Sequence, residues 1–577
     1  MFRRAFTAAL LLGTVTLGGA GIAGVSAAQK PDPGLAVLAK VNHVVVVYQE
    51  NHSFDNLYGG WEGVNGLAKA ASAPKQVNQS GAAFTCLRQL DVNLVSPPLP
   101  GDCTDSTSTV TPFTTHFPNQ TFSIDSYIPA TAVTCPAPGV FAASGLVAGS
   151  SGALPGGCTR DIVHRYYQEQ YQLDNGKMDR YVTGSDAAGL AMGTFVTTAL
   201  PIYKYLHATG HPRYAIADDF FQAAFGGSFL NHQWLICACT PIWTGAVNDG
   251  GADDLHSVVD GNGMPNNYSL YASPLGGAVK DQQLTASCSP GPGRAATPSF
   301  ASCGDYMVNT TQPPYQPYAP GTASTRLPPP QTLPTIGDRL TAGKVDWAWY
   351  SGGWSNADGD VGAPGWTNGS GPKCSDPYVL TTATYPNCPD GDFQFHHQPL
   401  NYFSTYAPGT QARKDHLKDE VEFVNLANAS KTTCKLKAVS FVKPVGEENE
   451  HPGYASETTG NTHLVDLIKS IEGGACAKDT MVIVTYDEFG GQWDHVSPPG
   501  TVGGVPGAHD KWGPGTRIPA LVISPLLKDN FVVDHVEHDT TSILATIEKR
   551  WNLKPLGTRD AHVASMATAF KATKPAS

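Results

Sequence analysis

The sequence contains few charged residues and no runs of basic ones. Only 15% of its 577 residues are charged, and 37 Lys and Arg stand against 49 Asp and Glu, for a formal charge of −12. Nucleic acids and anionic membrane surfaces are bound by clustered Lys and Arg, so this balance argues against both as the main partner. Beyond the N-terminal segment, no stretch approaches the roughly 18 apolar residues needed to span a bilayer. Small molecules are therefore the expected ligands, and the sequence leaves the oligomeric state open.

Glycine and proline, by contrast, are abundant, with 61 Gly and 45 Pro spread along the chain. This content excludes a coiled coil or a simple helical bundle and predicts long ordered loops between the regular elements. Hydrophobic residues make up 41% of the sequence, which is typical of a globular protein.

Residues 1–28 have the pattern of a signal peptide. Arg3 and Arg4 precede a stretch of small and apolar residues that ends in Val25-Ser26-Ala27-Ala28. A membrane anchor is the alternative, but the stretch is rich in Gly and ends in a cleavable pattern. We therefore expect an exported protein, periplasmic or extracellular, and the arginine pair leaves both Sec and twin-arginine export open.

Twelve cysteines, none of them in the signal peptide, occur in close pairs. In an exported chain such spacing is typical of disulfides that staple loops. Cys237 and Cys239 are the least certain pair because so short a loop strains a disulfide, and a metal or redox site is the alternative. The sequence does not settle the connectivity, but the neighbouring cysteines are Cys86 and Cys103, Cys135 and Cys158, Cys288 and Cys303, Cys374 and Cys388, and Cys434 and Cys476.

The pattern of apolar residues predicts an α/β protein. Four β-branched runs, at 44–48, 438–442, 481–486 and 518–524, predict buried strands. Apolar residues at steps of three and four over 462–471 and 540–551 predict helices. Strands that alternate with helices predict an α/β sandwich around one sheet. We interpret the Ser-, Thr-, Pro- and Gly-rich residues near 65–160 and 240–335 as insertions in a single domain over 29–577.

Polar side chains follow two of the predicted strands. Glu50 and Asn51 come directly after the first strand, and Asp487 and Glu488 come after the third. Ligands of open α/β sheets bind beyond the carboxyl ends of the strands, so both tips are expected to face one site. Carboxylate and amide oxygens are the ligands of hard divalent cations. Either tip alone is typical of a turn, but the two together favour a metal site.

Three histidines and one serine are further candidates. His164, His397 and His451 stand among polar residues, although any one of them alone would be read as a surface or hydrogen-bonded core residue. Ser228 follows two glycines, which form a turn that would expose its hydroxyl. The esterase elbow Gly-x-Ser-x-Gly is not formed, because Leu230 stands where its second glycine belongs.

These motifs, taken in order, resemble the phosphoesterase family of bacterial acid phosphatases and phospholipases C, which has the alkaline-phosphatase-like fold. The resemblance extends from about residue 40 to about residue 565 and rests on the segments 50–55, 175–179, 335–340, 416–419, 451–452, 487–496 and 513–519. It implies an α/β/α sandwich around one mostly parallel sheet.

The resemblance also implies a role for each candidate residue. Ser228 falls where the family places its nucleophile, and His164, His397 and His451 fall on the histidines that the acid-phosphatase branch presents to phosphate. The positions where the family holds its metal are occupied by Glu50, Asn51, Ser228, Asp487 and Glu488.

We therefore predict an exported, metal-dependent phosphoesterase, and specifically an acid phosphatase that hydrolyses phosphomonoesters through a phosphoserine at Ser228. One divalent cation is expected, and its oxygen ligands favour calcium, magnesium or manganese, with zinc as the alternative. Protonated histidines would hold the phosphoryl oxygens and favour acidic pH.

Two alternative functions remain. The first is a phospholipase C that cleaves the head groups of phospholipids. Two features lean against it: Ser228 stands where those enzymes generally have Thr, and the chain ends soon after the helix near Trp551, without the C-terminal β modules of many of them. The second is a surface protein that captures phosphate without turnover, which the retention of the whole presumed ligand set argues against.

Overall fold

The structure, a computed structural model, describes residues 32–575 except for 79, 92, 96–97, 108–111, 133–157, 244–305 and 501–506. Pro33–Ser577 form one compact unit. The predicted signal peptide lies outside the described residues, and the division into one domain with two insertions stays a prediction. None of the helices described is both long and apolar enough to cross a membrane.

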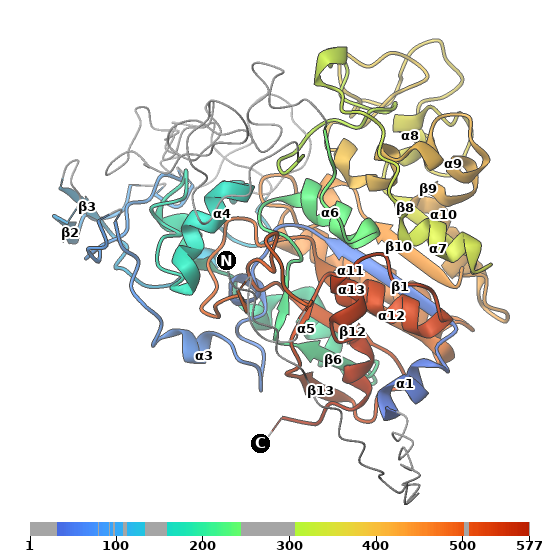
Figure 1. The fold of residues 1–577 in the computed structure, drawn as a ribbon. Coiled ribbons are helices and arrows are strands. Elements are labelled where there is room, and N and C mark those ends of the chain that lie inside the picture. Colours follow the sequence, from blue (N-terminus) through green and yellow to red (C-terminus); the bar gives the residue numbers. More distant parts are fainter. Residues whose placement is uncertain are drawn as a thin grey trace, which may run out of the picture. The chain divides into compact units, whose positions relative to one another are not determined.

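An eight-stranded sheet forms the centre of the unit Pro33–Ser577, in the order β13-β6-β12-β11-β1-β10-β8-β9 (Figure 1). β12 runs antiparallel to both of its neighbours, and all the other adjacent pairs are parallel. The predicted sandwich around a mostly parallel sheet is thereby confirmed. The strands are β1 (His43–Gln49), β6 (Tyr214–Ala217), β8 (Trp347–Ser351), β9 (Leu417–Asp419), β10 (Val439–Lys443), β11 (Thr480–Tyr486), β12 (Ala520–Ile523) and β13 (Phe531–Asp534).

The four strands predicted from the apolar runs lie side by side in the sheet, as β10, β1, β11 and β12. All of their residues are buried except His43, which is half-buried. Strands of this kind, rich in Val and Ile and without a polar face, are typical of a sheet that is covered by helices on both sides.

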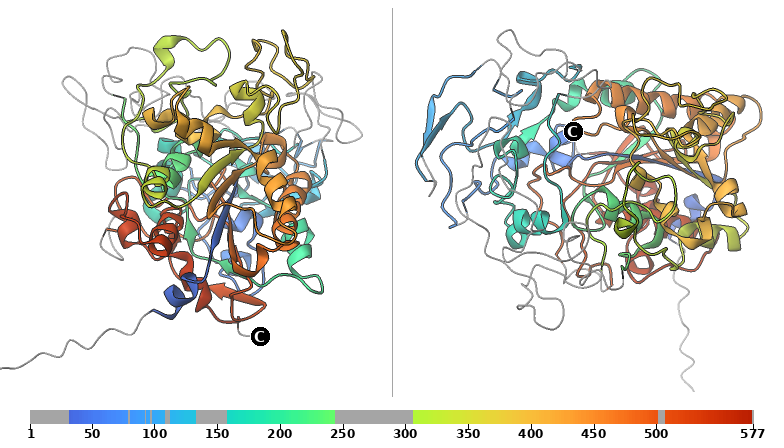
Figure 2. Two further views of the ribbon diagram at one scale, coloured as in Figure 1. Left: turned by 90° about the vertical axis from the view of Figure 1, so that its right-hand side faces the viewer. Right: turned by 90° about the horizontal axis from the view of Figure 1, so that it is seen from above.

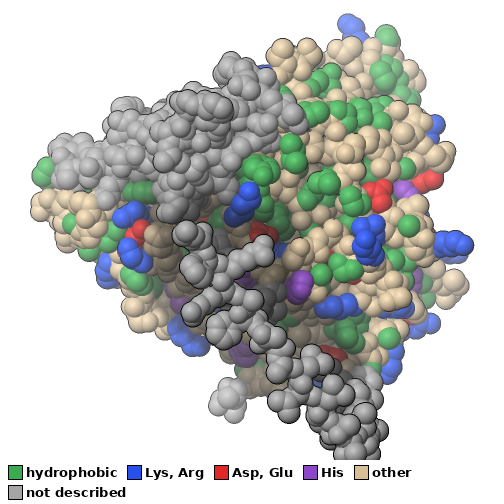
Figure 3. Space-filling view, viewed as in Figure 1, with side chains coloured by type: hydrophobic (Ala, Val, Ile, Leu, Met, Phe, Trp, Pro, Cys, Tyr) green, Lys and Arg blue, Asp and Glu red, His purple; other side chains and the backbone are tan. Residues whose placement is uncertain are grey.

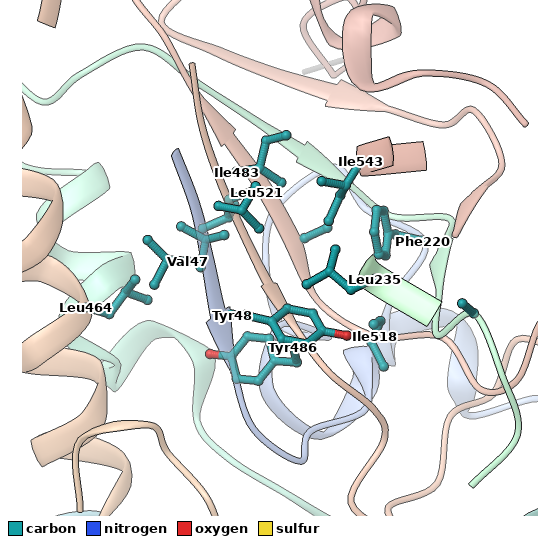
Figure 4. Close-up of a cluster of buried hydrophobic side chains, with 14 of the residues drawn as sticks. Val47, Tyr48, Phe220, Leu235, Leu464, Ile483, Tyr486, Ile518, Leu521 and Ile543 are labelled. Atoms are coloured by element: carbon teal, nitrogen blue, oxygen red, sulfur yellow. The ribbon is translucent and has the colours of Figure 1, made fainter. Parts of the chain in front are cut away.

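Helices cover both faces of the sheet, as the view from above in Figure 2 shows. On one face Leu464 of α11 (Glu457–Glu472) packs toward Val47, and on the other lie Leu235 of α6 (Ser228–Cys237) and Ile543 of α12 (Thr541–Trp551) (Figure 4). α11 contacts α5 (Pro201–Leu206) and α10 (Glu420–Ala429), whereas α6 contacts α12 and α7 (Ile336–Ala342).

The two predicted helices are confirmed as α11 and α12. α11 begins earlier than its apolar pattern because the Ser456 side chain accepts a hydrogen bond from the backbone N–H of Thr459 and so caps the first turn. The remaining helices are α1 (Pro33–Leu38), α2 (Phe54–Leu57), α3 (Leu67–Ala70), α4 (Tyr166–Leu173), α8 (Trp354–Asp358), α9 (Gln411–His416) and α13 (Arg559–His562).

Within the described residues, three two-stranded sheets lie outside the main one. They pair β2 (Cys103–Asp105) with β3 (Phe113–Thr115), β4 (Phe122–Ser123) with β5 (Gly193–Thr194), and β7 (Phe220–Phe221) with β14 (His538–Asp539). On the face of the molecule drawn in Figure 3, Lys and Arg side chains lie scattered among uncharged ones.

Four of the cysteine pairs that the sequence indicates are disulfides in the structure. The pair at Cys237 and Cys239 is bonded, so its two sulfur atoms are not free thiolates for a metal, and the metal alternative is wrong for these two residues. The other two predicted pairs each include residues outside the described ranges, and their bonds stay predictions. The other bonded pairs described are Cys86–Cys103, Cys374–Cys388 and Cys434–Cys476.

The packing predicts that the centre of the sheet contributes strongly to stability. The Ile483 side chain of β11 is fully buried, so Ile483→Ala would leave a cavity. We expect this substitution to lower the free energy of unfolding by about 2–5 kcal/mol. Val421→Ala is the control, because Val421 on α10 is 44% exposed, and its effect should stay within about 0.5 kcal/mol. Urea denaturation measures both, and equal midpoints for the two variants would contradict the central place of β11.

Candidate active site

The candidate metal ligands lie at the carboxyl ends of two adjacent strands. β1 and β11 are parallel, and their last residues, Gln49 and Tyr486, are paired. The residues that follow them, Glu50 and Asp487, therefore leave the sheet side by side. Both side chains are fully buried, as are those of Asn51 and Glu488. The two strand tips that the sequence indicated thus form one site.

Ser228 faces this site as the first residue of α6. Its Oγ lies 3.1 Å from Glu50 Oε2, 3.5 Å from Asn51 Oδ1 and 3.5 Å from Glu488 Oε1. The turn before α6 depends on Gly226, which has a φ of +91° and on which a Cβ would come within 2.6 Å of the backbone of Tyr166. The two glycines before Ser228 therefore place its hydroxyl against oxygens from both strand tips.

The three predicted histidines surround the same group of oxygens. His164, two residues before α4, has its Nε2 3.6 Å from Glu488 Oε1. His397, in the short 3-10 helix η8 (Phe395–His397), has its Nε2 3.1 Å from Glu50 Oε1. His451, between β10 and α11, has its Nε2 3.0 Å from Asn51 Nδ2. The structure thus brings together all eight residues singled out from the sequence.

The buried carboxylates repel one another. Burial and the charge of Glu50 raise the pKa of Asp487 well above its ordinary value, and burial and the charge of Asp487 do the same for Glu488. Backbone N–H groups stabilise the ionised forms in part: Asn51 and Glu488 donate to Asp487 Oδ1 at 3.1 and 2.8 Å. Asp487 Oδ2 is buried and has no hydrogen-bond partner among the described residues. The protein's own groups therefore leave negative charge at this point incompletely balanced.

The Asn51 amide lies between His451 and the carboxylates, and its orientation decides which of its atoms faces each of them. His451 Nδ1 lies 2.7 Å from the carbonyl oxygen of Pro452, which can only accept, so Nδ1 carries a proton. A neutral His451 then accepts at Nε2, and the group that donates to it is Asn51 Nδ2. The Asn51 amide oxygen consequently faces other oxygens, at Glu50 and Glu488. In the rotated orientation the Asn51 amide nitrogen would donate hydrogen bonds to both carboxylates. Asn51 Oδ1 would then accept from His451 Nε2, which would have to carry a proton in addition to the one on Nδ1.

The donor set fits a hard divalent cation. Three carboxylates, one amide oxygen and the Ser228 hydroxyl converge, and each is an oxygen ligand of the kind that calcium, magnesium and manganese prefer. The unpartnered Asp487 Oδ2 has an explanation in a cation among these oxygens. The structure thus supplies groups able to bind a metal ion, and metal analysis of the purified protein would identify that ion.

Two of the histidines differ from expectation in their charge. Burial and the nearby ammonium of Lys443 lower the pKa of His397 well below its ordinary 6.5. Burial and the neighbouring His164 likewise lower the pKa of His451. The surrounding protein therefore favours the neutral imidazoles rather than the protonated ones expected from the sequence, because solvation of an imidazolium is lost inside the fold.

Two further residues of the site were missed at the level of sequence. Lys443 is the last residue of β10, is fully buried, and donates hydrogen bonds to Glu50 Oε1 and to the carbonyl of Tyr48. His232 lies one helical turn after Ser228 and stacks on His397 with ring centroids 4.9 Å apart. Lys443 could have been identified as a lysine that ends an apolar strand, and His232 by its spacing of four residues from Ser228.

A cavity of about 270 Å³ opens beside His164 and Gly227. Polar and charged side chains make up much of its wall, and His164 connects it to the carboxylate cluster. Gly227, which precedes Ser228 in the sequence, lines the cavity and places it next to the candidate nucleophile. The cavity is lined by Asp161, Ile162, Val163, His164, Arg165, Asp186, Gly227, Phe229, Val308, Asn309 and Thr310.

Curated proteins with similar sequences include several phospholipases C. "Phospholipase C B" of Mycobacterium tuberculosis is 35% identical over 161 residues, or 24% of this chain and 30% of that protein. "Non-specific phospholipase C6" of Arabidopsis thaliana is 28% identical over 155 residues, or 23% of this chain and 30% of that protein. The matched region thus spans less than a third of the length of these relatives.

A solved structure, that of a protein in the alkaline phosphatase superfamily from Vibrio parahaemolyticus, is 14% identical and has a TM-score of 0.21, with 42% of this chain and 54% of that chain covered. The profile of the Phosphoesterase family matches residues 41–127 and 143–554, which is most of the chain. On the strength of that match the chain belongs to the Phosphoesterase family.

Proposed function

We propose that the protein is a metal-dependent phosphoric ester hydrolase and that its preferred substrates are phosphomonoesters, which makes it an acid phosphatase. The observation that carries the proposal is the position of the Ser228 hydroxyl, 3.1 Å from Glu50 Oε2 and within 3.5 Å of oxygens from the tips of both β1 and β11. A nucleophile held against a carboxylate cluster is the arrangement that metal-assisted phosphoryl transfer needs. Family membership supports the same class of chemistry.

The reaction can be derived from the residues of the site. A cation held by Glu50, Asn51, Asp487 and Glu488 would lower the pKa of the Ser228 hydroxyl and neutralise charge on the phosphoryl oxygens. Ser228 Oγ loses its proton to solvent and attacks phosphorus, the bond from phosphorus to the alcohol oxygen breaks, the alcohol leaves with a proton from His164, and a phosphoserine forms. Water then attacks that phosphorus and releases inorganic phosphate, which restores the serine.

His164 is the residue best placed to protonate the leaving alcohol. Its Nδ1 is 2.6 Å from the carbonyl oxygen of Ile162 and so donates there, which leaves Nε2 directed at the site. It also lines the cavity into which the alcohol would extend. Unlike His397 and His451, its side chain is partly exposed, at 19%, so water can deliver and remove its proton. We assign it the role of general acid, and His397 and His451 the role of orienting the phosphoryl group.

The cavity beside His164 supports a hydrophilic alcohol as leaving group. Asp161, Arg165, Asp186 and Asn309 are among its lining residues, and such groups favour a sugar- or polyol-like alcohol over acyl chains. The second candidate is a phospholipase C, favoured by the similarity to proteins of that name. In that case the substrates would be the phosphodiester head groups of phospholipids.

Export is part of the proposal as well. Disulfides persist in oxidising compartments, and four of them lie in the described residues. They support a periplasmic or extracellular location, in agreement with the N-terminal signal pattern of the sequence.

The first prediction concerns the nucleophile. Ser228→Ala should lower kcat for p-nitrophenyl phosphate by about 10³-fold or more, because it removes the hydroxyl that would form the phosphoserine. Ser404→Ala is the matched control: Ser404 also begins a helix, the short η10 (Ser404–Tyr406), but it is exposed and should keep full activity. Full activity of Ser228→Ala would remove the proposed mechanism. A wild type that binds phosphate without turnover would support a capture protein instead.

The second prediction separates the two candidate substrate classes. We expect kcat/KM for p-nitrophenyl phosphate to exceed that for p-nitrophenyl phosphorylcholine by about tenfold or more, a difference of about 1.4 kcal/mol in transition-state binding. Steady-state assays at one pH and one metal concentration measure both. The opposite ratio would identify the protein as a phospholipase C.

The third prediction is that a chelator lowers Tm more at neutral than at acidic pH. Because the pKa values of Asp487 and Glu488 are raised, these carboxyls favour the folded state below their ordinary pKa and lose that contribution as the pH rises. A cation needs the same groups deprotonated and so stabilises more as the pH rises. We expect a Tm loss of about 5 °C or more near pH 7.5 and a smaller one near pH 5.

The control for the chelator experiment is Asp487→Asn, whose Tm should respond little to the chelator at either pH because a ligand is missing. Differential scanning calorimetry measures the Tm of both proteins with and without chelator at each pH. Equal losses at both pH values in the wild type, or no loss at either, would contradict a cation at the carboxylate cluster.

A further inference from the structure

The two carboxylate oxygens of Glu50 face different surroundings. Oε2 lies 3.1 Å from Ser228 Oγ, on the side of the proposed metal ligands. Oε1 contacts Lys443 Nζ and lies 3.1 Å from His397 Nε2. Glu50 therefore stands between two groups of residues. The first consists of the proposed metal ligands near Oε2, and the second consists of the residues near Oε1. The proposed function uses only the first group for its metal.

The second group has the ligands of a zinc site. His232 Nδ1 lies 2.7 Å from the carbonyl oxygen of Ser228 and so carries a proton, which leaves the lone pair on Nε2. That Nε2 is buried, lies 3.9 Å from Glu50 Oε1, and has no hydrogen-bond partner among the described residues. One ligand atom each from Glu50, His232 and His397 lie within 4.8 Å of one another. Two imidazoles and one carboxylate are a known ligand set for zinc.

Lys443 places a positive charge at this second group. Its ammonium is fully buried and donates to Glu50 Oε1 and, at 3.0 Å, to the carbonyl oxygen of Tyr48 at the end of β1. The ammonium thereby neutralises the one carboxylate that a second metal ion would need. A divalent cation at the same oxygen would be repelled at close range inside a poorly solvated site.

We propose that Lys443 takes the place of a second divalent cation at Glu50, so that the protein binds a single metal ion, and that removing the Lys443 charge opens a zinc site formed by Glu50, His232 and His397. This inference rests on the proposed metal site, which it deepens. It explains why a lysine ends β10 in the interior of the protein, where an unpaired ammonium would be strongly unfavourable.

The experiment counts bound zinc. The full chain is stripped with a chelator, incubated with excess zinc chloride, freed of loosely bound metal by gel filtration, and analysed by inductively coupled plasma mass spectrometry. We expect one zinc ion per chain for the wild type and two for Lys443→Met, whose unbranched side chain is similar in length but uncharged. The usual zinc ligands in proteins are Cys, His, Asp and Glu, so a second ion would report on Glu50, His232 and His397 and not on the methionine.

Two controls locate the additional ion. Lys443→Arg keeps the charge and should bind one zinc ion, as the wild type does. In the double variant Lys443→Met with His232→Gln, the count should return to one, because one imidazole of the second site is lost. Zinc bound elsewhere on the surface would survive the His232 change. Circular dichroism and Tm establish that each variant is folded, and Lys443→Gln replaces Lys443→Met if the latter does not fold.

The outcomes separate this inference from the proposed function. One zinc ion in both the wild type and the folded, uncharged variant would overturn the role of Lys443 while leaving the proposed hydrolase intact. Two zinc ions in the wild type would also overturn it, because Lys443 would then not exclude the second ion. No bound zinc in the wild type, and no bound metal after the same procedure with magnesium, manganese or calcium chloride, would remove the proposed metal site itself and this inference with it.

Discussion

The burial of three carboxylates at one edge of the sheet is the constraint on which the site depends. Glu50, Asp487 and Glu488 are all fully buried, and one lysine, Lys443, contacts the group directly. Separating ionised carboxylates from water is strongly unfavourable unless positive charge or hydrogen bonds accompany them. Backbone N–H groups supply some of these, such as that of Gly490, which donates to Glu488 Oε2 at 2.6 Å. The remaining charge defines the place for a cation.

The fold holds this unfavourable arrangement through register and through a second buried network. A shift of one residue between β1 and β11 would turn every side chain to the opposite face and separate the strand tips. Beyond the tips, Arg517 forms ion pairs of 3.1 Å with Asp55 and with Asp494, and its guanidinium lies over Phe54. Asp55 belongs to the segment after β1 and Asp494 to the segment after β11. One arginine thus ties together the two loops that carry the ligands.

The central strands and the oxygen ligands could be predicted from the sequence, because both leave strong local signals. Uninterrupted Val and Ile runs predict buried strands, and polar residues directly after them mark the edge where ligands bind. β8, by contrast, reads Trp-Ala-Trp-Tyr-Ser and β6 only Tyr-Ala-Ile-Ala, and so short or aromatic a run is ambiguous. Lys443 was missed because the group that it contacts, Glu50, lies hundreds of residues away in the sequence. His232 was missed because only its position one helical turn after Ser228 brings it to the site, where it stacks on His397.

The charge state of the histidines has consequences for the proposed chemistry. A sequence shows how many histidines are present but not how deeply each is buried, and burial is the largest cause that lowers the pKa of His397, His451 and His232. Neutral imidazoles can still orient a phosphoryl group through one N–H each, but they cannot supply positive charge. That charge must then come from a cation and Lys443, while the proton for the leaving alcohol comes from the more accessible His164.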